Sequence, residues 1–287
     1  MIPNCNKSIY DVTIQDVIEK CHYKYLRYAL GVNKRAPKLG VYGETGRYTI
    51  ALECFVNSLK YLYKINDTSS SFNKLLFDGL KENENLQQQK SNWLSNLLRV
   101  LNENINISKL TKLGTNYILK VLKSTLQSKF RDGWRENLFN DERTQFGNKL
   151  RTYRMFKNSF NPESYLFLID DKTTRSALTR FRLSAHNLHI ETGRYKKGKE
   201  RLEPNDRLCN KCPDNIMEDE FHLLMVCSHY NNLREIFFKK INSFSPVFNS
   251  LKIHVQFIWL MANLDTRVII LLADFIKQCF KHRAGKT

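Results

Sequence analysis

Proline and glycine are scarce in this chain of 287 residues, with 6 and 11 occurrences. Collagen-like repeats, proline-rich stretches and glycine-rich linkers are therefore excluded. Long apolar runs are also missing. The closest approach, residues 253–277, is interrupted by Asn263, Asp265 and Arg267, so no membrane-spanning helix is expected. The N-terminal sequence has no apolar segment of the signal-peptide type, and a secreted protein is not expected.

Motifs of the common catalytic classes are absent as well. Residues 40–48 (GVYGETGRY) have their glycines at the wrong spacing for a P-loop and lack its Gly-Lys-Ser/Thr ending. Neither the G-x-S-x-G nor the H-E-x-x-H motif occurs. Asp170 and Asp171 are a carboxylate pair, but a helix cap explains them more simply than a metal-binding acidic box. No catalytic residue is therefore predicted, and the chain is not expected to be an enzyme.

The seven cysteines are an odd number in a chain without a secretory signal. Such cysteines are expected to be reduced thiols and not a disulfide framework. The sequence therefore predicts an intracellular protein, in the nucleus or the cytoplasm.

Positive charge is abundant. The chain has 46 Lys and Arg against 28 Asp and Glu, a net charge of +18. Residues 120–211 alone hold 21 basic and 11 acidic side chains, which is more than half of the excess. An excess of this size favours a polyanionic partner, most commonly RNA or DNA, although a basic solubilising surface is the alternative.

Apolar residues recur at intervals of three and four more often than they alternate, which predicts a mainly α-helical fold. The strongest amphipathic pattern is at residues 47–65, with Ile50, Phe55, Leu59 and Leu62 along one side. The predicted architecture is an irregular helical array with a small zinc-stabilised module near the C-terminal third. Further helices are expected at residues 12–30, 91–103, 109–139, 143–156, 172–187 and 229–242, with two more within residues 250–283.

Four residues have the spacing of a metal site, C-x2-C-x9-H-x4-C: Cys209, Cys212, His222 and Cys227. Zinc takes four ligands tetrahedrally, and three cysteines with one histidine are an accepted structural set. A turn after Cys212 would bring the first two thiolates together, and an expected short helix over residues 218–226 would supply the other two ligands. His229 is a spare candidate ligand.

The role of such a zinc ion would be structural, because four protein ligands leave no position open for water. Zinc binding of about 10–16 kcal/mol in finger peptides would supply folding energy that so short a segment lacks. The alternatives are buried cysteines that bind no metal and a redox C-x2-C motif. The redox motif would need a βαβ context, which is missing here.

Basic residues cluster just before the cysteines. In the expected helix at 172–187, Leu178 and Phe181 fall on one side, and a cationic group lies about a third of a turn away. Residues 193–207 read as an exposed basic loop, while Trp134 and Phe156, within basic segments, are expected in the core. A solvated charged face is the alternative to phosphate binding. The predicted nucleic-acid-binding residues are Lys172, Arg175, Arg182, His186, Arg194, Lys196, Lys197 and Arg201.

Two stretches resemble a known family. Residues 182–235 (RLSAHNLHIETGRYKKGKERLEPNDRLCNKCPDNIMEDEFHLLMVCSHYNNLRE) resemble the C-terminal zinc-binding tail of non-LTR retrotransposon reverse transcriptases. Residues 25–50 resemble the segment after the polymerase thumb in the same proteins. The resemblance implies zinc ligation by Cys209, Cys212, His222 and Cys227, and a role in holding template RNA or target DNA.

The polymerase itself is missing from this sequence. The family's Tyr/Phe-x-Asp-Asp box does not occur, since Asp170 and Asp171 follow Leu168 and Ile169. The expected organisation is a helical region resembling the post-thumb segment (1–140), a basic helical connector (141–204), the zinc module (205–232) and C-terminal helices (233–287).

Two functions follow as hypotheses. The first is a non-catalytic nucleic-acid-binding remnant or domesticated tail of a reverse transcriptase, in which structural zinc supports a basic surface. The second is a protein-interaction or vestigial chain that self-associates through apolar helices at residues 253–280.

Overall fold

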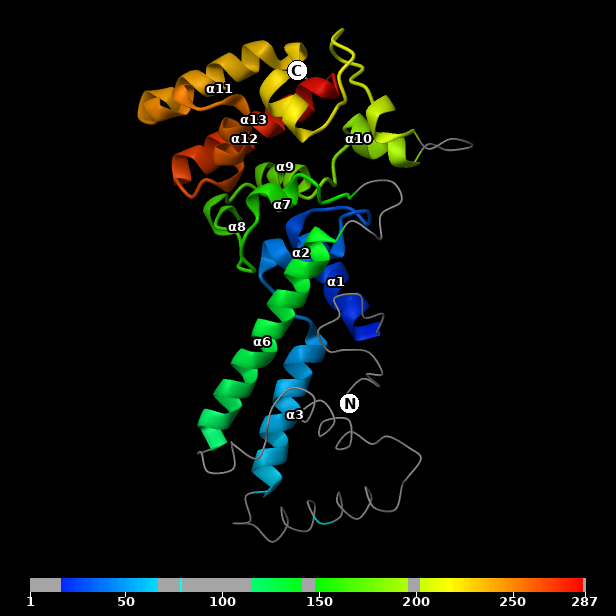
Figure 1. The fold of residues 1–287 in the computed structure, drawn as a ribbon, viewed down its shortest axis with the longest axis vertical. Helices are drawn as coiled ribbons and strands as arrows, with labels where there is room; N and C mark the ends of the chain where they lie inside the picture. The colour runs from blue at the N-terminus through cyan, green and yellow to red at the C-terminus, as the bar shows by residue number, and fades with distance from the viewer. Residues whose placement is uncertain (1–16, 67–77, 79–114, 141–147, 196–201, 286–287) are drawn as a thin grey trace. The chain divides into compact units, whose positions relative to one another are not determined.

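The computed structural model describes residues 17–66, 78, 115–140, 148–195 and 202–285, shown as a coloured ribbon in Figure 1. Over these ranges the chain forms helices and short helical turns, and its β pairing is one isolated bridge between Leu208 and Met217. The predicted mainly α-helical fold is confirmed. No single described helix is long and apolar enough to cross a membrane. Only α12 (Ile253–Ala262) and α13 (Thr266–Arg283) meet such a criterion as a pair, bent by 106°.

The chain divides into two compact units. Unit 1 comprises Met1–His22 and Tyr48–Asn137, and unit 2 comprises Tyr23–Arg47 and Leu138–Thr287. The division into four segments (1–140, 141–204, 205–232 and 233–287) stays a prediction from the sequence. The expected helix at 91–103 lies outside the described residues.

Unit 1 has its described core along α3 (Ile50–Asn66) and α6 (Thr115–Phe139). Phe55 and Leu59 are buried as the amphipathic pattern predicts, while the side chain of Leu62 lies outside the described set. Trp134 on α6 is buried, so its expected place in the core is confirmed. The burial of these large apolar side chains stabilises α3 and α6 in the described part of this unit.

Unit 2 receives the second half of α1 (Val17–Leu30), which ends at Gly31 as predicted. The φ of Gly31 is +66°, a value that glycine adopts without strain. The following helix α2 (Lys38–Thr45) was not predicted. A Cβ atom on Gly40 would lie 2.6 Å from the side chain of Leu183, so this glycine allows close packing. Tertiary packing here overrides the low helix propensity of glycine.

The middle helices are shorter than predicted. The expected helix at 143–156 is wrong over residues 148–152, which form turns, and only α7 (Tyr153–Phe156) is helical there. The expected helix at 172–187 is α9 (Lys172–Arg182), which ends before Ser184 because that residue has φ 48°. Asp171 accepts hydrogen bonds from the N–H groups of Thr173 and Thr174, so the predicted cap is confirmed. The remaining short helices are α8 (Tyr165–Leu168) and α10 (His189–Thr192).

The C-terminal helices are close to their predicted ranges. Figure 1 shows α11 (Asn231–Phe244) gathered with α12 and α13. Phe237 of α11 stacks on Phe275 of α13 with ring centroids 4.7 Å apart. Phe280 of α13 meets the edge of Phe181 of α9 at 6.4 Å. Because α13 contacts both neighbours through aromatic rings, it is the central helix of unit 2.

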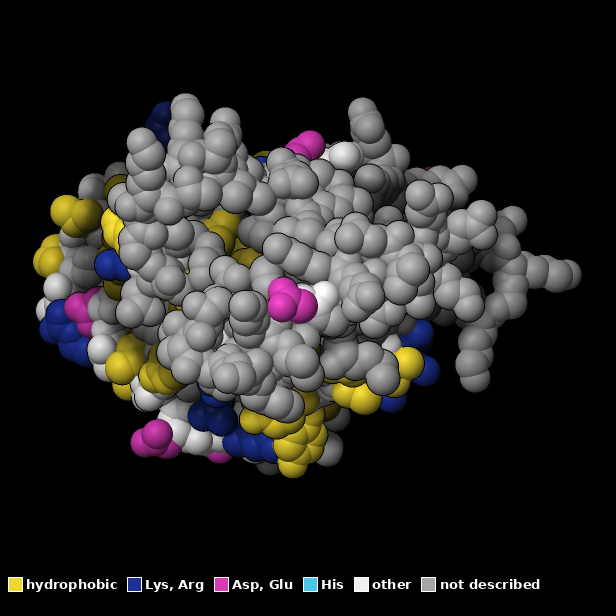
Figure 2. Space-filling model, turned by 90° about the horizontal axis from the view of Figure 1, so that it is seen from below, with side chains coloured by type: hydrophobic (Ala, Val, Ile, Leu, Met, Phe, Trp, Pro, Cys, Tyr) yellow, Lys and Arg dark blue, Asp and Glu magenta, His cyan; other side chains and the backbone are white. Residues whose placement is uncertain are grey.

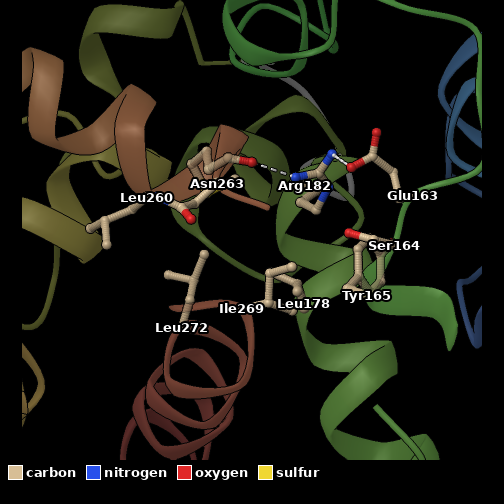
Figure 3. Close-up of a pocket in the computed structure, with 10 residues that line it drawn as sticks. Glu163, Ser164, Tyr165, Leu178, Arg182, Leu260, Asn263, Ile269 and Leu272 are labelled. Carbon is tan, nitrogen blue, oxygen red and sulfur yellow. Dashed lines mark hydrogen bonds and ion pairs between the residues drawn. The ribbon is translucent and has the colours of Figure 1, made fainter. Parts of the chain in front are cut away.

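A buried ion network crosses unit 2 beside this core. Arg182 Nε lies 3.1 Å from Glu44 Oε1, and Arg182 Nη2 lies 2.7 Å from Glu163 Oε2. Arg182 Nη1 also donates to the backbone oxygen of Met261 at 2.7 Å. Figure 3 shows Arg182 pointing to Glu163 on one side and to the end of α12 on the other, beside a small hollow that both polar and apolar side chains line. Tyr165 donates to Glu44 Oε2 at 2.5 Å.

The ion pairs of the network offset the cost of burying the charged groups of Glu44 and Arg182. Burial raises the pKa of the Glu44 carboxyl, although Arg182 opposes the rise. Burial would lower the pKa of Arg182, but Glu44 and Glu163 raise it above its ordinary value. Each charge is therefore stable in the interior only while its partner is present.

Arg182→Met should lower the free energy of unfolding by about 3–5 kcal/mol, because it leaves the buried Glu44 carboxyl without its cation and Glu163 with Lys157 alone. Arg267 provides the matched control, since it pairs with Asp265 at 2.7 Å on the surface. Arg267→Met should change stability little. Urea unfolding followed by circular dichroism measures both variants, and equal effects of the two substitutions would contradict the structural role of Arg182.

Candidate metal centre

Cys209 and Cys212 lie on a turn that antiparallel backbone bonds close. The N–H of Cys209 donates to the carbonyl of Ile216 at 2.8 Å. Within the turn, the N–H of Lys211 points at the sulfur of Cys209 at 3.4 Å, and Asn215 has a left-handed φ of 50°. Asparagine is among the residues that adopt this conformation most readily. The turn therefore presents both thiols to the same side.

His222 and Cys227 are placed by a π-helical turn, η4 (His222–Val226). The N–H of Cys227 donates to the carbonyl of His222 at 2.7 Å, and a bond across five residues defines a π turn. The H-x4-C spacing thus sets the two ligands one π turn apart. The expected helix over residues 218–226 is correct in its later part, where its geometry is π and not α. Asp219 accepts from the N–H of His222 at 2.8 Å and holds the start of this turn.

The two halves bring all four donor atoms together. The sulfur atoms of Cys209, Cys212 and Cys227 and a ring nitrogen of His222 lie within 4.8 Å of one another. Cys209 Sγ is 3.9 Å from Cys227 Sγ, and Cys212 Sγ is 3.4 Å from His222 Nε2. Two thiolates on one tetrahedral zinc ion, each at about 2.3 Å, would be about 3.8 Å apart. The predicted cluster is therefore present with spacing that suits a metal ion.

Protonation of the cluster is tuned by burial. Burial raises the pKa of Cys227 to about 12 and also raises the pKa of Cys209. Burial lowers the pKa of His222 and so favours the neutral imidazole, which is the form that binds metals. In the metal-free chain the thiols of Cys209 and Cys227 are therefore protonated at neutral pH. A bound metal must displace these protons, so its apparent affinity rises with pH and falls as the solution becomes acidic.

The buried carboxylate of Glu220 joins this centre to the rest of unit 2. Glu220 is fully buried and lies 2.8 Å from Arg151 Nη2 and 2.8 Å from His186 Nε2. It also accepts from the hydroxyl groups of Thr152 and Ser184, at 2.9 and 2.6 Å. Burial would raise the pKa of Glu220, but Arg151 and His186 hold it well below its ordinary range. The carboxylate is therefore a fixed anion inside the protein.

Two arginines fasten the other edges of the centre. Arg283, at the end of α13, forms a bidentate ion pair with Glu218, which also accepts from the N–H of His189 at 2.6 Å. Arg234 donates to the carbonyl of Cys227 at 2.7 Å and to two carbonyl groups of the π turn. These bonds satisfy backbone acceptors that a π turn leaves open.

The predicted nucleic-acid-binding residues do not form one exposed group. Lys172 is exposed, and Arg175 is half-buried and donates to the carbonyl of Ile169 at 2.7 Å. Arg182 and His186 are buried in the ion networks described above. Arg194 is buried beside Glu191, with 3.2 Å between its Nε and a carboxylate oxygen. The burial removes these three residues from any surface for a phosphate backbone. Lys196, Lys197 and Arg201 lie outside the described residues.

Three arginines that fasten the metal centre are not predicted from the sequence: Arg151, Arg234 and Arg283. Each is distant in sequence from the group that it fastens, except Arg234, which follows Cys227 by seven residues. The only sequence signal is the acidic run Glu218-Asp219-Glu220 inside the zinc-like motif, which indicates that basic partners lie nearby.

Searches against family models, curated proteins and solved structures find no match to this chain. The resemblance to reverse transcriptase tails therefore stays a prediction.

The purified protein should hold one divalent metal ion per chain at the cluster. Cys227→Ser should remove it, because an alcohol is a far poorer ligand than a thiolate, and should lower the midpoint of thermal unfolding. Cys21→Ser is the matched control, since Cys21 is exposed and outside the cluster. Mass spectrometry of the metal content, together with circular dichroism, measures both effects. A Cys227→Ser protein that keeps its metal would contradict the assignment.

Proposed function

We propose that this chain is a non-catalytic nucleic-acid-binding module whose contact surface is supported by a structural zinc ion. Zinc is the metal that best suits three thiolates and one imidazole in tetrahedral spacing. All four positions would be filled by protein, which leaves none for a substrate or a water nucleophile. The proposed role of the ion is therefore to hold the backbone of residues 207–230.

The observation that carries the proposal is an exposed tyrosine with a cation over its ring. Lys172 Nζ lies 4.7 Å from the ring centroid of Tyr28, and this ring is 72% exposed. Tyr25, one turn earlier on α1, is 67% exposed. An aromatic ring open to solvent beside a cation can stack on a base while the cation meets a phosphate.

Further cations lie beside this pair. Lys34 is exposed in the segment after α1. Arg180, exposed on α9, donates from its Nε to the carbonyl of Gly31 at 2.7 Å and so joins α9 to the end of α1. We refer to these residues as the contact surface: Tyr25, Tyr28, Lys34, Lys172 and Arg180. Figure 2 shows lysine and arginine side chains beside hydrophobic ones on the described part of the face that it draws.

The charge distribution supports the same function. Several arginines of unit 2 are balanced by buried carboxylates, as with Arg151 and Arg182. The acidic residues Glu218 and Glu220 of the zinc module face inward, so they do not repel a polyanion from its surface. The net charge of +18 is thus carried mainly by other side chains and favours an anionic partner. The resemblance of residues 182–235 to reverse transcriptase tails supports an origin as a remnant or domesticated tail.

A second candidate function is self-association, because apolar side chains are exposed in the C-terminal part. Leu264, between α12 and α13, is 78% exposed, and Ile236, Val247 and Val255 are also exposed. Exposed apolar side chains mark protein contacts where they join into one patch. Light scattering against concentration, with and without RNA, separates this candidate from nucleic-acid binding.

Tyr28→Ala should weaken binding to a single-stranded RNA of mixed sequence by about 1–3 kcal/mol, which is the contribution of a stacked base. Lys172→Ala should reduce the slope of log affinity against log salt by about one unit, since one phosphate contact is lost. Lys239→Ala is the control, because Lys239 is exposed on α11, away from the contact surface in sequence. Fluorescence anisotropy across salt concentrations measures all three. An affinity that does not change with salt would refute nucleic-acid binding.

A further inference from the structure

Two histidines meet beside the cysteine cluster without belonging to it. His229 lies in the turn η5 (Ser228–Tyr230), directly after Cys227, and His282 lies in the last turn of α13. His229 Nε2 and His282 Nδ1 are 3.0 Å apart. The rings meet edge to face with centroids 4.5 Å apart. His282 is exposed and His229 half-buried, so solvent reaches the pair.

Both rings are held by elements that other contacts already fix. His229 packs edge to face against the buried ring of Tyr230 at 4.8 Å. The residue after His282 is Arg283, whose guanidinium is locked in the ion pair with Glu218. The two imidazoles therefore face each other where α13 is already held against the metal module by the bidentate Arg283–Glu218 ion pair. A ligand that used both rings would need little reorganisation of the backbone.

The spacing of the two nitrogens suits one particular class of ion. With metal–nitrogen bonds of about 2.1 Å, a separation of 3.0 Å gives a nitrogen–metal–nitrogen angle of about 90°. That is the angle between neighbouring ligands on a tetragonal or octahedral ion such as Cu²⁺ or Ni²⁺. Two imidazoles on a tetrahedral ion would be about 3.4 Å apart. Imidazole nitrogens suit Ni²⁺ and Cu²⁺, and the affinity of a nitrogen site for divalent ions rises toward Cu²⁺.

We propose that His229 and His282 form a second metal site, which binds a divalent ion of the nickel and copper class and is completed by water. In the metal-free protein one ring donates its N–H to the other ring. On binding, that proton moves to the other nitrogen of the same ring, and both facing nitrogens then offer a lone pair. The neighbouring cations are Lys211 and Arg283, and the charge of Arg283 is balanced by Glu218.

Such an ion would couple the metal module to the C-terminal helix. One ligand follows the cysteine cluster by two residues, and the other is on α13. Binding would stabilise the folded chain by RT ln(1 + L/Kd), with L the free metal concentration, because the unfolded chain does not hold the two rings together. The inference does not require nucleic-acid binding, and the result for one site does not decide the other.

Calorimetric titration of tag-free protein, as purified and with its metal content measured, tests the site with Ni²⁺ as the probe. We expect one further equivalent to bind, with a raised thermal unfolding midpoint. His282→Ala should weaken this binding at least tenfold and abolish the shift in the midpoint. His254→Ala is the matched control, since His254 is exposed on α12 and stacks on Phe221. That variant should bind Ni²⁺ as the unaltered protein does.

A chelating dye that reports released zinc separates a second site from replacement at the first. Nickel uptake without release of resident metal supports the proposal. Uptake matched by release, absence of nickel binding, or equal binding by His282→Ala protein would each overturn it. His282→Gln provides a second variant that keeps a polar side chain at this exposed position, and it should lose the site as well.

Discussion

The convergence of three thiols and one imidazole on a single point is the constraint on which the metal module depends. Between Arg207 and Tyr230 the structure has one isolated β bridge and short helical turns, so few backbone bonds define the shape. The sulfur atoms of Cys209 and Cys227 nevertheless lie 3.9 Å apart, although burial favours their protonated forms. A bound metal ion would replace those protons and supply the folding energy that the short segment lacks.

The buried carboxylates extend this constraint into unit 2. Glu220 accepts from four side chains, and Glu218 from Arg283 and a backbone N–H. The module is therefore fastened through Glu218 and Glu220, whose carboxylates are turned away from solvent, while Asp206 and Asp214 are exposed. The same arrangement explains how a chain with many arginines can bury some of them. Arg182 belongs to the interior and Arg151 is half-buried against Glu220, and the surface charge comes from lysines and arginines such as Lys172 and Arg180.

The sequence predicts the features that local chemistry determines. Apolar residues at intervals of three and four predict α11 and the two helices within residues 250–283. Asp171 identifies the start of α9, and the C-x2-C-x9-H-x4-C spacing identifies the cluster. Contacts between distant residues escape prediction. Glu44 lies 138 residues before its partner Arg182, and nothing near either residue indicates that they pair. Helix α2 escapes as well, because Gly40 disfavours a helix locally and is required there by the approach of the Leu183 and Leu150 side chains.

The central claim is that one zinc ion, bound by Cys209, Cys212, His222 and Cys227, holds the module. X-ray absorption at the zinc edge of the purified protein tests it most directly. The account predicts stoichiometric zinc with three sulfur ligands at about 2.3 Å and one nitrogen at about 2.0–2.1 Å. A first shell of nitrogen and oxygen alone, or a folded protein without stoichiometric zinc, would contradict it.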